Sequence, residues 1–219
     1  MKIIQAGYEI IDPLNGEDIL KKIEYIARKC YKSEDKICEG SAESMVRNLI
    51  KRGHEAMLEH FSFSVCFTVD RGVSHEIVRH RVASFAQEST RYCNYSKSGD
   101  VSFIRPCFLG EDTTPFDNWL DSCMRAEREY FIMLENGYTP EEARAVLPNS
   151  LKTELVMTAN LREWRHFFKL RAVGVTGKPH PQMLEVAVPL LQELKDLIPV
   201  VFEDLEPMEV TVHGEKEIR

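Results

Sequence analysis

The sequence lacks the features of a membrane or secreted protein. No window approaches the run of about 18 apolar residues that a membrane-spanning helix requires. The N-terminus has neither the apolar segment nor the small-residue cleavage site of a secretory signal. The six cysteines include no Cys-x-x-Cys pair, which argues against a zinc ribbon. These absences predict a cytoplasmic protein that binds no membrane and whose thiols are reduced and mainly buried.

A basic excess is also missing, because the net charge is −7. This balance argues against broad, sequence-independent binding of nucleic acid, although a few clustered arginines can still form a positive pocket. The chain has 219 residues, of which 43% are hydrophobic and 29% charged, with no internal repeat and no Pro/Gly/Ser-rich linker. One globular domain over residues 1–219 is therefore expected.

Two families of motif are absent as well. The sequence contains no His-Glu-x-x-His and no tight His/Asp/Glu grouping with ligand spacing, so no metal site is expected. It contains neither Gly-x-Gly-x-x-Gly nor Gly-x-x-x-x-Gly-Lys-Ser/Thr. Any dinucleotide would therefore be held without a Rossmann turn.

Hydrophobic periodicity predicts a helix-rich α+β protein with strands spread among the helices. The predicted elements are a weak strand over 1–11, helices over 17–31 and 41–52, a strand over 61–69, a helix over 74–83, a loop over 85–100, helices over 116–136 and 139–147, a strand over 151–158, and helices over 160–170 and 181–197, the last interrupted or bent at Pro189. The strand over 61–69 is the clearest, because its apolar residues alternate with polar ones.

Capping signals place the starts of four helices. Ser41 and Ser74 can each cap the helix that follows. Thr139 precedes Pro140 and is followed three residues later by a glutamate, which is a strong start signal. Asn160 and Glu163 repeat this spacing, so Glu163 is interpreted as a helix-start residue.

A cluster of charged residues lies on the helix predicted from His75 to Ala83. Arg79 comes three residues after Glu76 and shares its helix face, whereas Arg81 points roughly 200° away. Such a helix suits two anionic ligands, or one ligand at a subunit boundary. The polar run 87–91 then offers amides, a hydroxyl and an arginine that can cradle a phosphate. A solvated helix face followed by a polar loop would have the same composition.

The order and spacing of these residues resemble a known signature. Arg79-His80-Arg81, seven further residues and then Ser89 form the Arg-His-Arg-x7-Ser pattern of the flavin-dependent thymidylate synthases. Four other segments resemble conserved segments of that family: Gly53-His54 with Glu59-His60, Arg144 with Leu147-Pro148, Asn160-Leu161-Arg162 with His166, and Leu170-Arg171. The resemblance covers nearly the whole chain.

The resemblance implies a specific enzyme. Members of the family methylate dUMP to dTMP for de novo dTTP synthesis, with 5,10-methylenetetrahydrofolate as carbon donor, FAD as redox carrier and NADPH as reductant. It also implies a single helix-rich α+β domain around a mainly antiparallel sheet, in a fold specific to the family. The assembly would be a homotetramer whose active sites are shared between subunits.

The resemblance also assigns site residues. The residues expected to bind dUMP are Glu76, Arg79, Gln87, Glu88, Ser89, Arg91, Arg144 and Arg171. Those expected to contact FAD are His54, Ala56, Arg79, His80, Arg81, Gln87, Asn160, Arg162 and His166. Arg171 is the expected catalytic residue, because a cation beside the pyrimidine stabilises uracil deprotonated at N3. Ser89 is expected to bind phosphate and not to act as a nucleophile, because the motif contains no base to activate it.

Two positions depart from the family pattern. Ala56 stands where relatives often have Ser or Thr, so one hydroxyl contact to FAD is in doubt. Glu76 stands where Gln is common, and its carboxylate is expected to pair with Arg79 or His80. Two other functions remain open: a nonenzymatic nucleotide-binding or regulatory module, and a phosphohydrolase with Arg79 and Arg81 as a clamp. The latter needs a metal or an activated nucleophile, and the sequence indicates neither.

Overall fold

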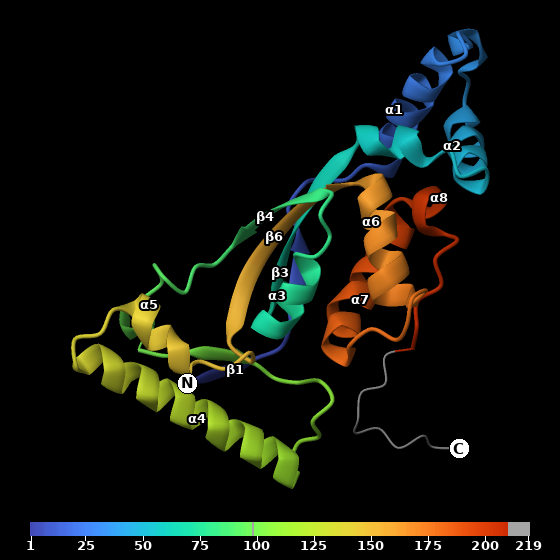
Figure 1. Ribbon diagram of the computed structural model, residues 1–219. Helices are drawn as coiled ribbons and strands as arrows, with labels where there is room; N and C mark the ends of the chain where they lie inside the picture. Colours follow the sequence, from blue (N-terminus) through green and yellow to red (C-terminus); the bar gives the residue numbers. More distant parts are fainter. Residues whose placement is uncertain (98, 210–219) are drawn as a thin grey trace, which may run out of the picture.

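A computed structural model describes residues 1–97 and 99–209 (Figure 1). Its main sheet has four strands in the order β2-β3-β6-β4, and every neighbouring pair is antiparallel. The strands are β2 (Gly7–Ile10), β3 (Ser62–Asp70), β6 (Lys152–Asn160) and β4 (Ala83–Gln87). The prediction of an α+β protein is confirmed, and the sheet expected from the family resemblance is antiparallel.

The two central strands carry the core. In β3 the side chains of Phe63, Val65, Phe67 and Val69 are buried, as the alternation in the sequence predicts. β6 pairs with β3 along its whole length, from Ser62 opposite Asn160 to Asp70 opposite Lys152, and alternates in the same way. The core therefore lies on one face of these two long strands.

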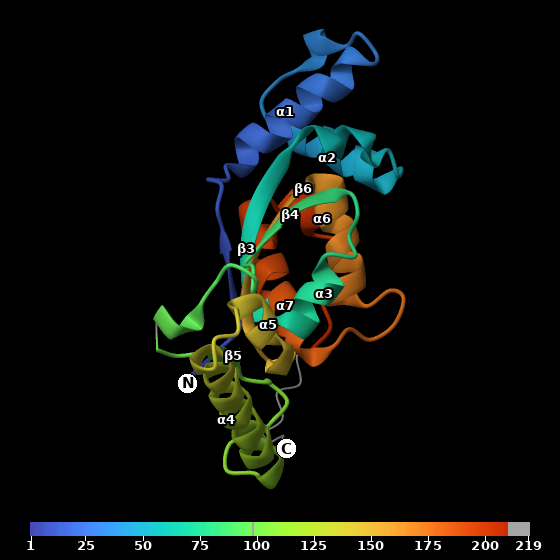
Figure 2. The ribbon, with the colours of Figure 1, turned by 60° about the vertical axis from the view of Figure 1, so that its left-hand side comes forward.

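Three helices cover this face: α3 (Arg71–Ile77), α6 (Leu161–Phe168) and α7 (Pro181–Leu197) (Figure 2). Trp164 of α6 stacks on Phe63 with ring centroids 5.0 Å apart, and Phe167 packs beside Phe67. A π-helix, η5 (Lys169–Val173), continues α6, and α8 (Pro199–Phe202) follows α7. Pro189 lies inside α7 without ending it.

The remaining elements lie at the two ends of the sheet (Figures 1 and 2). At one end are α1 (Gly16–Lys29), the short η1 (Glu34–Lys36), α2 (Ser41–Lys51) and η2 (Glu55–His60). At the other end, β1 (Lys2–Ile4) pairs in parallel with β5 (Ser102–Ile104), and these pack with η3 (Tyr95–Lys97), α4 (Thr114–Glu135), α5 (Pro140–Ala143) and η4 (Arg144–Val146) around a second apolar cluster. Within the described residues, no helix combines the length and the apolarity needed to cross a membrane.

The helix predicted over 74–83 is wrong. Asp70, and not Ser74, caps α3 by accepting a hydrogen bond from the backbone N–H of Val73 at 2.7 Å. The helix ends at Ile77, and residues 83–87, part of which were expected to be loop, form β4 against β6. Pairing with a long neighbouring strand outweighs a weak local helix preference. The signature Arg79-His80-Arg81 therefore lies on the turn between α3 and β4.

Other differences are smaller. Residues 1–11 form two strands in two sheets, and Gly40, in the left-handed conformation with φ 74°, precedes α2 in place of the predicted Ser41 cap. The Ser41 hydroxyl instead bonds to the backbone of Cys38. All six cysteines are free thiols and only Cys123 is buried, so the expectation of mainly buried cysteines is wrong.

Candidate functional site

Arg171 lies on the π-helix that follows α6, and such helices are frequent at functional sites. Gly174, with φ 76°, ends this turn in a conformation that favours glycine. The Arg171 guanidinium donates from Nη1 to the Glu76 carboxylate at 2.8 Å and from Nη2 to the Glu76 carbonyl at 3.0 Å. Its Nε donates to His80 Nε2 at 3.2 Å. The expectation that Glu76 pairs with Arg79 or His80 is therefore wrong, because its partner is Arg171.

His80 links this arginine to a buried carboxylate. Its side chain is 3% exposed, and its Nδ1 lies 3.1 Å from an oxygen of Glu163. Burial, and then the positive charge of Arg171, lowers the pKa of His80 to about 4. Burial raises the pKa of Glu163. At neutral pH the imidazole is therefore uncharged and accepts the hydrogen bond from Arg171.

A pocket of about 750 Å³ opens beside these groups. Its lining includes Arg79, His80, Arg81, His166 and Arg171. Arg79 and Arg81 are exposed, and across residues 1–97 and 99–209 neither side chain forms a hydrogen bond or an ion pair. The pocket therefore presents guanidinium groups that are free to bind an anion.

A second pocket of about 450 Å³ adjoins the first and shares Val82, Glu163 and His166 with it. Asn160 and Arg162 lie in its wall, and Arg162 donates to Glu59 at 2.5 Å. Most of the residues expected to contact FAD thus line two connected pockets. His54 and Ala56 are exposed at the start of η2, where the residue between them, Glu55, lines the pocket instead.

The remaining candidate arginines form another group on the chain after β4. Arg91 donates to the Glu141 carboxylate at 2.9 Å, and Arg144 donates to the Glu141 carbonyl at 3.1 Å and to the buried Thr90 hydroxyl at 3.0 Å. The Ser89 hydroxyl accepts from the backbone N–H of Arg91 at 3.3 Å. These contacts place three of the predicted dUMP ligands side by side.

Gln87 and Glu88 stand between the two groups. The Gln87 amide donates to Ser74 at 2.9 Å and to Thr153 at 3.2 Å, which ties the end of β4 to α3 and β6. The Glu88 carboxylate accepts from Lys152 at 3.1 Å and from Tyr95 at 3.2 Å. Both side chains are held by these partners.

The two arginine groups lie at opposite ends of β4. We call the residues Glu76, Arg79, His80, Arg81 and Arg171 the Arg171 group, and the residues Ser89, Arg91 and Arg144 the Arg144 group. β4 has five residues, which span about 17 Å at roughly 3.3 Å per residue. Within the described chain, no hydrogen bond or ion pair joins one group to the other.

Sequence analysis missed several partners of the predicted site residues, namely Glu163, Thr90, Glu141 and Lys152. It also missed that His80, Glu163 and His166 come together, with one ligand atom of each within 4.8 Å of the others. The inference that no tight His/Asp/Glu grouping exists is therefore wrong. The Arg171 guanidinium, bonded to His80, makes this grouping unfavourable for a cation.

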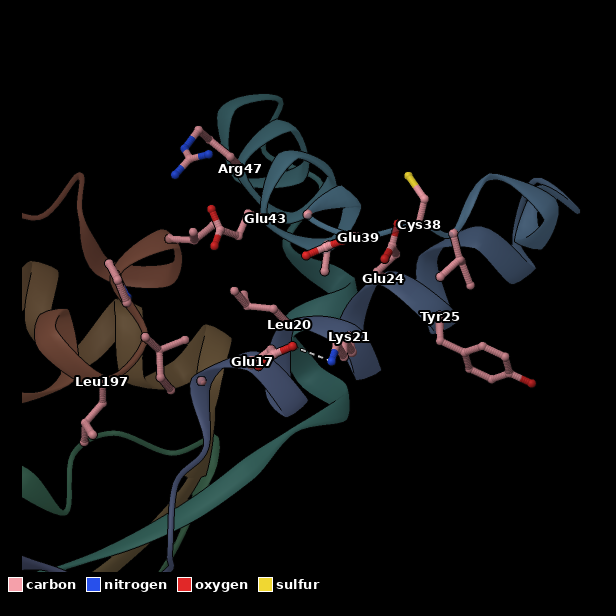
Figure 3. A pocket seen from close by; sticks show the side chains of 17 residues that line it. Glu17, Leu20, Lys21, Glu24, Tyr25, Cys38, Glu39, Glu43, Arg47 and Leu197 are labelled. Atoms are coloured by element: carbon pink, nitrogen blue, oxygen red, sulfur yellow. Dashed lines mark ion pairs between the residues drawn. The ribbon is translucent and has the colours of Figure 1, made fainter.

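Pocket size alone does not locate the site. A pocket of about 980 Å³ lies among α1, α2 and the junction of α7 with α8 (Figure 3). Its wall carries four glutamates and an ion pair of Lys21 with Glu17 at 2.5 Å. None of the predicted site residues lines it.

Comparisons with known proteins agree with the signature. The family model described as "Thymidylate synthase complementing protein" matches residues 11–200. The chain is 32% identical over 200 residues to the flavin-dependent thymidylate synthase of Corynebacterium aurimucosum, covering 83% of this chain and 78% of that protein. It is 33% identical over 174 residues to the corresponding enzyme of Pyrococcus horikoshii, covering 76% and 70%.

A solved structure shares the fold. The UMP/dUMP methylase PolB from Streptomyces cacaoi, bound with 5-Br dUMP, superposes with a TM-score of 0.78, at 23% identity over 93% of this chain and 96% of that one. Because the family model spans most of the sequence and relatives exceed 30% identity over most of their length, this chain belongs to the thymidylate synthase complementing protein family, whose members among these relatives are flavin-dependent thymidylate synthases.

Proposed function

We propose that this protein is a flavin-dependent thymidylate synthase that methylates dUMP to dTMP. The observation that carries the proposal is the position of the family signature: Arg79, His80 and Arg81 line one pocket with Arg171. The enzymes named among the relatives and the uridine nucleotide bound by the Streptomyces methylase support the same substrate. We further propose 5,10-methylenetetrahydrofolate as the carbon donor and NADPH as the reductant.

The two connected pockets fit FAD in their chemistry. A diphosphate needs cationic donors, and Arg79, Arg81 and Arg162 stand around the pockets with no Rossmann turn. We propose that these arginines, with His54, Ala56, His80, Gln87, Asn160 and His166, hold the cofactor. When bound, FAD supplies the redox chemistry, and the protein contributes placement and charge.

Arg171 is suited to act on the pyrimidine. A guanidinium has five N–H groups, and three of those on Arg171 are already bonded within the chain. The other two, one on each Nη, are available to the pocket. Two donors next to a uracil carbonyl would stabilise negative charge that develops when N3 loses its proton.

The Arg144 group is suited to the nucleotide phosphate, but no hydrogen bond or ion pair within the described residues joins it to Arg171. We therefore propose a homotetramer in which the Arg144 group of one subunit completes the pocket formed by the Arg171 group of another. Exposure supports this assembly: the side chain of Arg91 is 53% exposed, and its ion-pair partner Glu141 is exposed as well. Glu76, Gln87 and Glu88 remain predicted dUMP contacts, and a single domain and a cytoplasmic location remain predictions.

The test is purification followed by flavin spectroscopy and turnover. The protein is expected to be yellow, or to become so with added FAD, and to form dTMP from dUMP with methylenetetrahydrofolate and NADPH. A preparation that stays colourless with added FAD and forms no dTMP would contradict the proposal. Binding of dUMP and FAD without turnover would instead favour a nonenzymatic nucleotide-binding module.

A further inference from the structure

Glu163 occupies a helix-start position but does not serve the helix start. At the beginning of α5, Glu142 and Thr139 form a complete capping box, in which Glu142 accepts from the Thr139 backbone N–H at 2.8 Å. At the beginning of α6 only half of this motif exists: Asn160 accepts from the Glu163 backbone N–H at 2.9 Å. The Glu163 carboxylate turns to His80 instead.

This placement is unfavourable for stability alone. The Glu163 side chain is 9% exposed, and burying a carboxylate is costly unless a charged partner compensates for it. Its partner is an imidazole that is uncharged at neutral pH, because burial and Arg171 lower the pKa of His80. The arrangement therefore points to a role beyond folding.

The hydrogen bonds determine the tautomer of His80. A neutral imidazole donates from one nitrogen and accepts at the other, and the partner of one nitrogen fixes the state of both. Glu163 only accepts when ionised, so the His80 proton resides on Nδ1. His80 Nε2 is then free to accept from Arg171 Nε at 3.2 Å. A proton on Nε2 would instead face the N–H of Arg171.

The orientation of Arg171 depends on this bond. His80 holds Nε, and Glu76 holds the two Nη atoms with its carboxylate and its backbone carbonyl. These three contacts fix the plane of the guanidinium and leave one N–H on each Nη directed away from them. Without the bond at Nε, only the contacts to Glu76 would remain.

We propose that Glu163 is a positioning residue for nucleotide binding: by fixing the His80 tautomer, it holds the Arg171 guanidinium with its two free donors toward the uridine nucleotide. This inference rests on the proposed function, in which Arg171 contacts the nucleotide. It adds a carboxylate from α6 to a site whose other members come from α3, the signature turn and the π-helix.

The test uses the full-length flavin-loaded protein and the variant Glu163→Gln. Glutamine keeps the size of the side chain but can also donate to His80 Nδ1, which permits the other tautomer. We expect dUMP binding to weaken about tenfold, the magnitude typical of losing a group that orients a ligand. NMR spectra of isotope-labelled histidine are expected to show that His80 no longer carries its proton only on Nδ1.

Two further comparisons separate positioning from stability. In an Arg171→Ala background, Glu163→Gln is expected to cause no additional loss of dUMP affinity, because its effect passes through Arg171. Glu24→Gln is the matched control, since Glu24 is also a buried glutamate and accepts a hydrogen bond from Arg28 on α1 at 2.8 Å. That variant is expected to leave dUMP affinity unchanged even where it lowers the melting temperature.

The outcomes distinguish the two proposals. An unchanged His80 tautomer in Glu163→Gln, or an equal loss of affinity with and without Arg171, overturns the positioning role. Wild-type protein that binds no dUMP overturns the proposed function instead. A weakened affinity together with a changed tautomer supports both.

Discussion

The Arg171 group and the Arg144 group place the same side chain in two different settings. Arg171 is 18% exposed and makes three hydrogen bonds, one of them to a buried imidazole that is itself held by a carboxylate. Arg91 and Arg144 lie at the surface, on a turn and on the short η4, and share the partner Glu141. One group is organised by the core of its own chain, whereas the other is held mainly by contacts between residues 89–91 and residues 141–144.

This difference suggests a division of labour. A group that stabilises developing charge must be fixed before the substrate arrives, since fixed donors cost no reorganisation during the reaction. A group that binds a phosphate gains from exposure, because its charge must first meet the ligand. The Arg171 group is therefore suited to stabilising charge during the reaction, and the more exposed Arg144 group to binding the phosphate of the incoming nucleotide.

The largest expected effect separates these roles directly. Arg171→Ala is expected to lower the rate of dTMP formation by about 100-fold or more, as the loss of a fixed donor to a developing charge does. Arg144→Ala is expected to raise the KM for dUMP about tenfold, as the loss of a charged hydrogen bond does. Steady-state kinetics on flavin-loaded protein measures both.

Arg47→Ala is the matched control for these variants, since Arg47 pairs with Glu203 at 2.8 Å on the surface and lines neither proposed binding pocket. It should leave kcat and KM unchanged. Equal losses of kcat in Arg171→Ala and Arg144→Ala would remove the distinction between the two groups.

The next effect concerns pH, because the Arg171 group contains a buried titratable imidazole. The pKa of His80 is lowered to about 4 from 6.5, so between these values the unfolded chain binds more protons than the folded one. The contribution of the neutral His80 to the free energy of unfolding is therefore complete above pH 6.5. It is lost as the pH falls toward 4. The loss from His80 between pH 7 and pH 5 amounts to about 2 kcal/mol of unfolding free energy.

Three charged or titratable groups face His80 and affect how the free energy of unfolding depends on pH. Arg171 stays charged throughout, whereas the raised pKa of Glu163 opposes the slope and His166 lies beside the ring. His80→Asn removes the titration while keeping a donor and an acceptor. Chemical denaturation at both pH values is expected to show a smaller loss in the variant than in the wild type. The same loss in both proteins would rule out His80 as its source.

Sequence patterns predicted the parts of the fold that depend on local signals. Clean alternation located β3, and the capping residue Asn160 located the start of α6. β4 was missed because its partner strand lies about 70 residues further on, and its own alternation of Ala83, Ser84 and Phe85 has little polar contrast. Pairing with β6, and not local propensity, forms this strand.

The candidate site divides in the same way. The signature located the pocket of Arg79, His80 and Arg81, since those residues are adjacent in the chain. The partner of His80 is 83 residues away, and its spacing from Asn160 suggested a capping role. Contacts of this kind depend on the final packing, so no pattern within one segment indicates them.

The smallest expected effect comes from removing the carboxylate that pairs with Arg91 in the Arg144 group. Phosphate binding by Arg91 must displace Glu141, whose side chain is 48% exposed. Such exposed ion pairs contribute little, so Glu141→Gln is expected to tighten dUMP binding by about threefold at most. Glu76→Gln removes the corresponding carboxylate from the half-buried Arg171 and is expected to weaken binding instead, because Glu76 orients that guanidinium. Isothermal titration with dUMP measures both changes. If both variants shifted the affinity in the same direction, the two carboxylates would have the same role, and burial would not be what separates the two arginine groups.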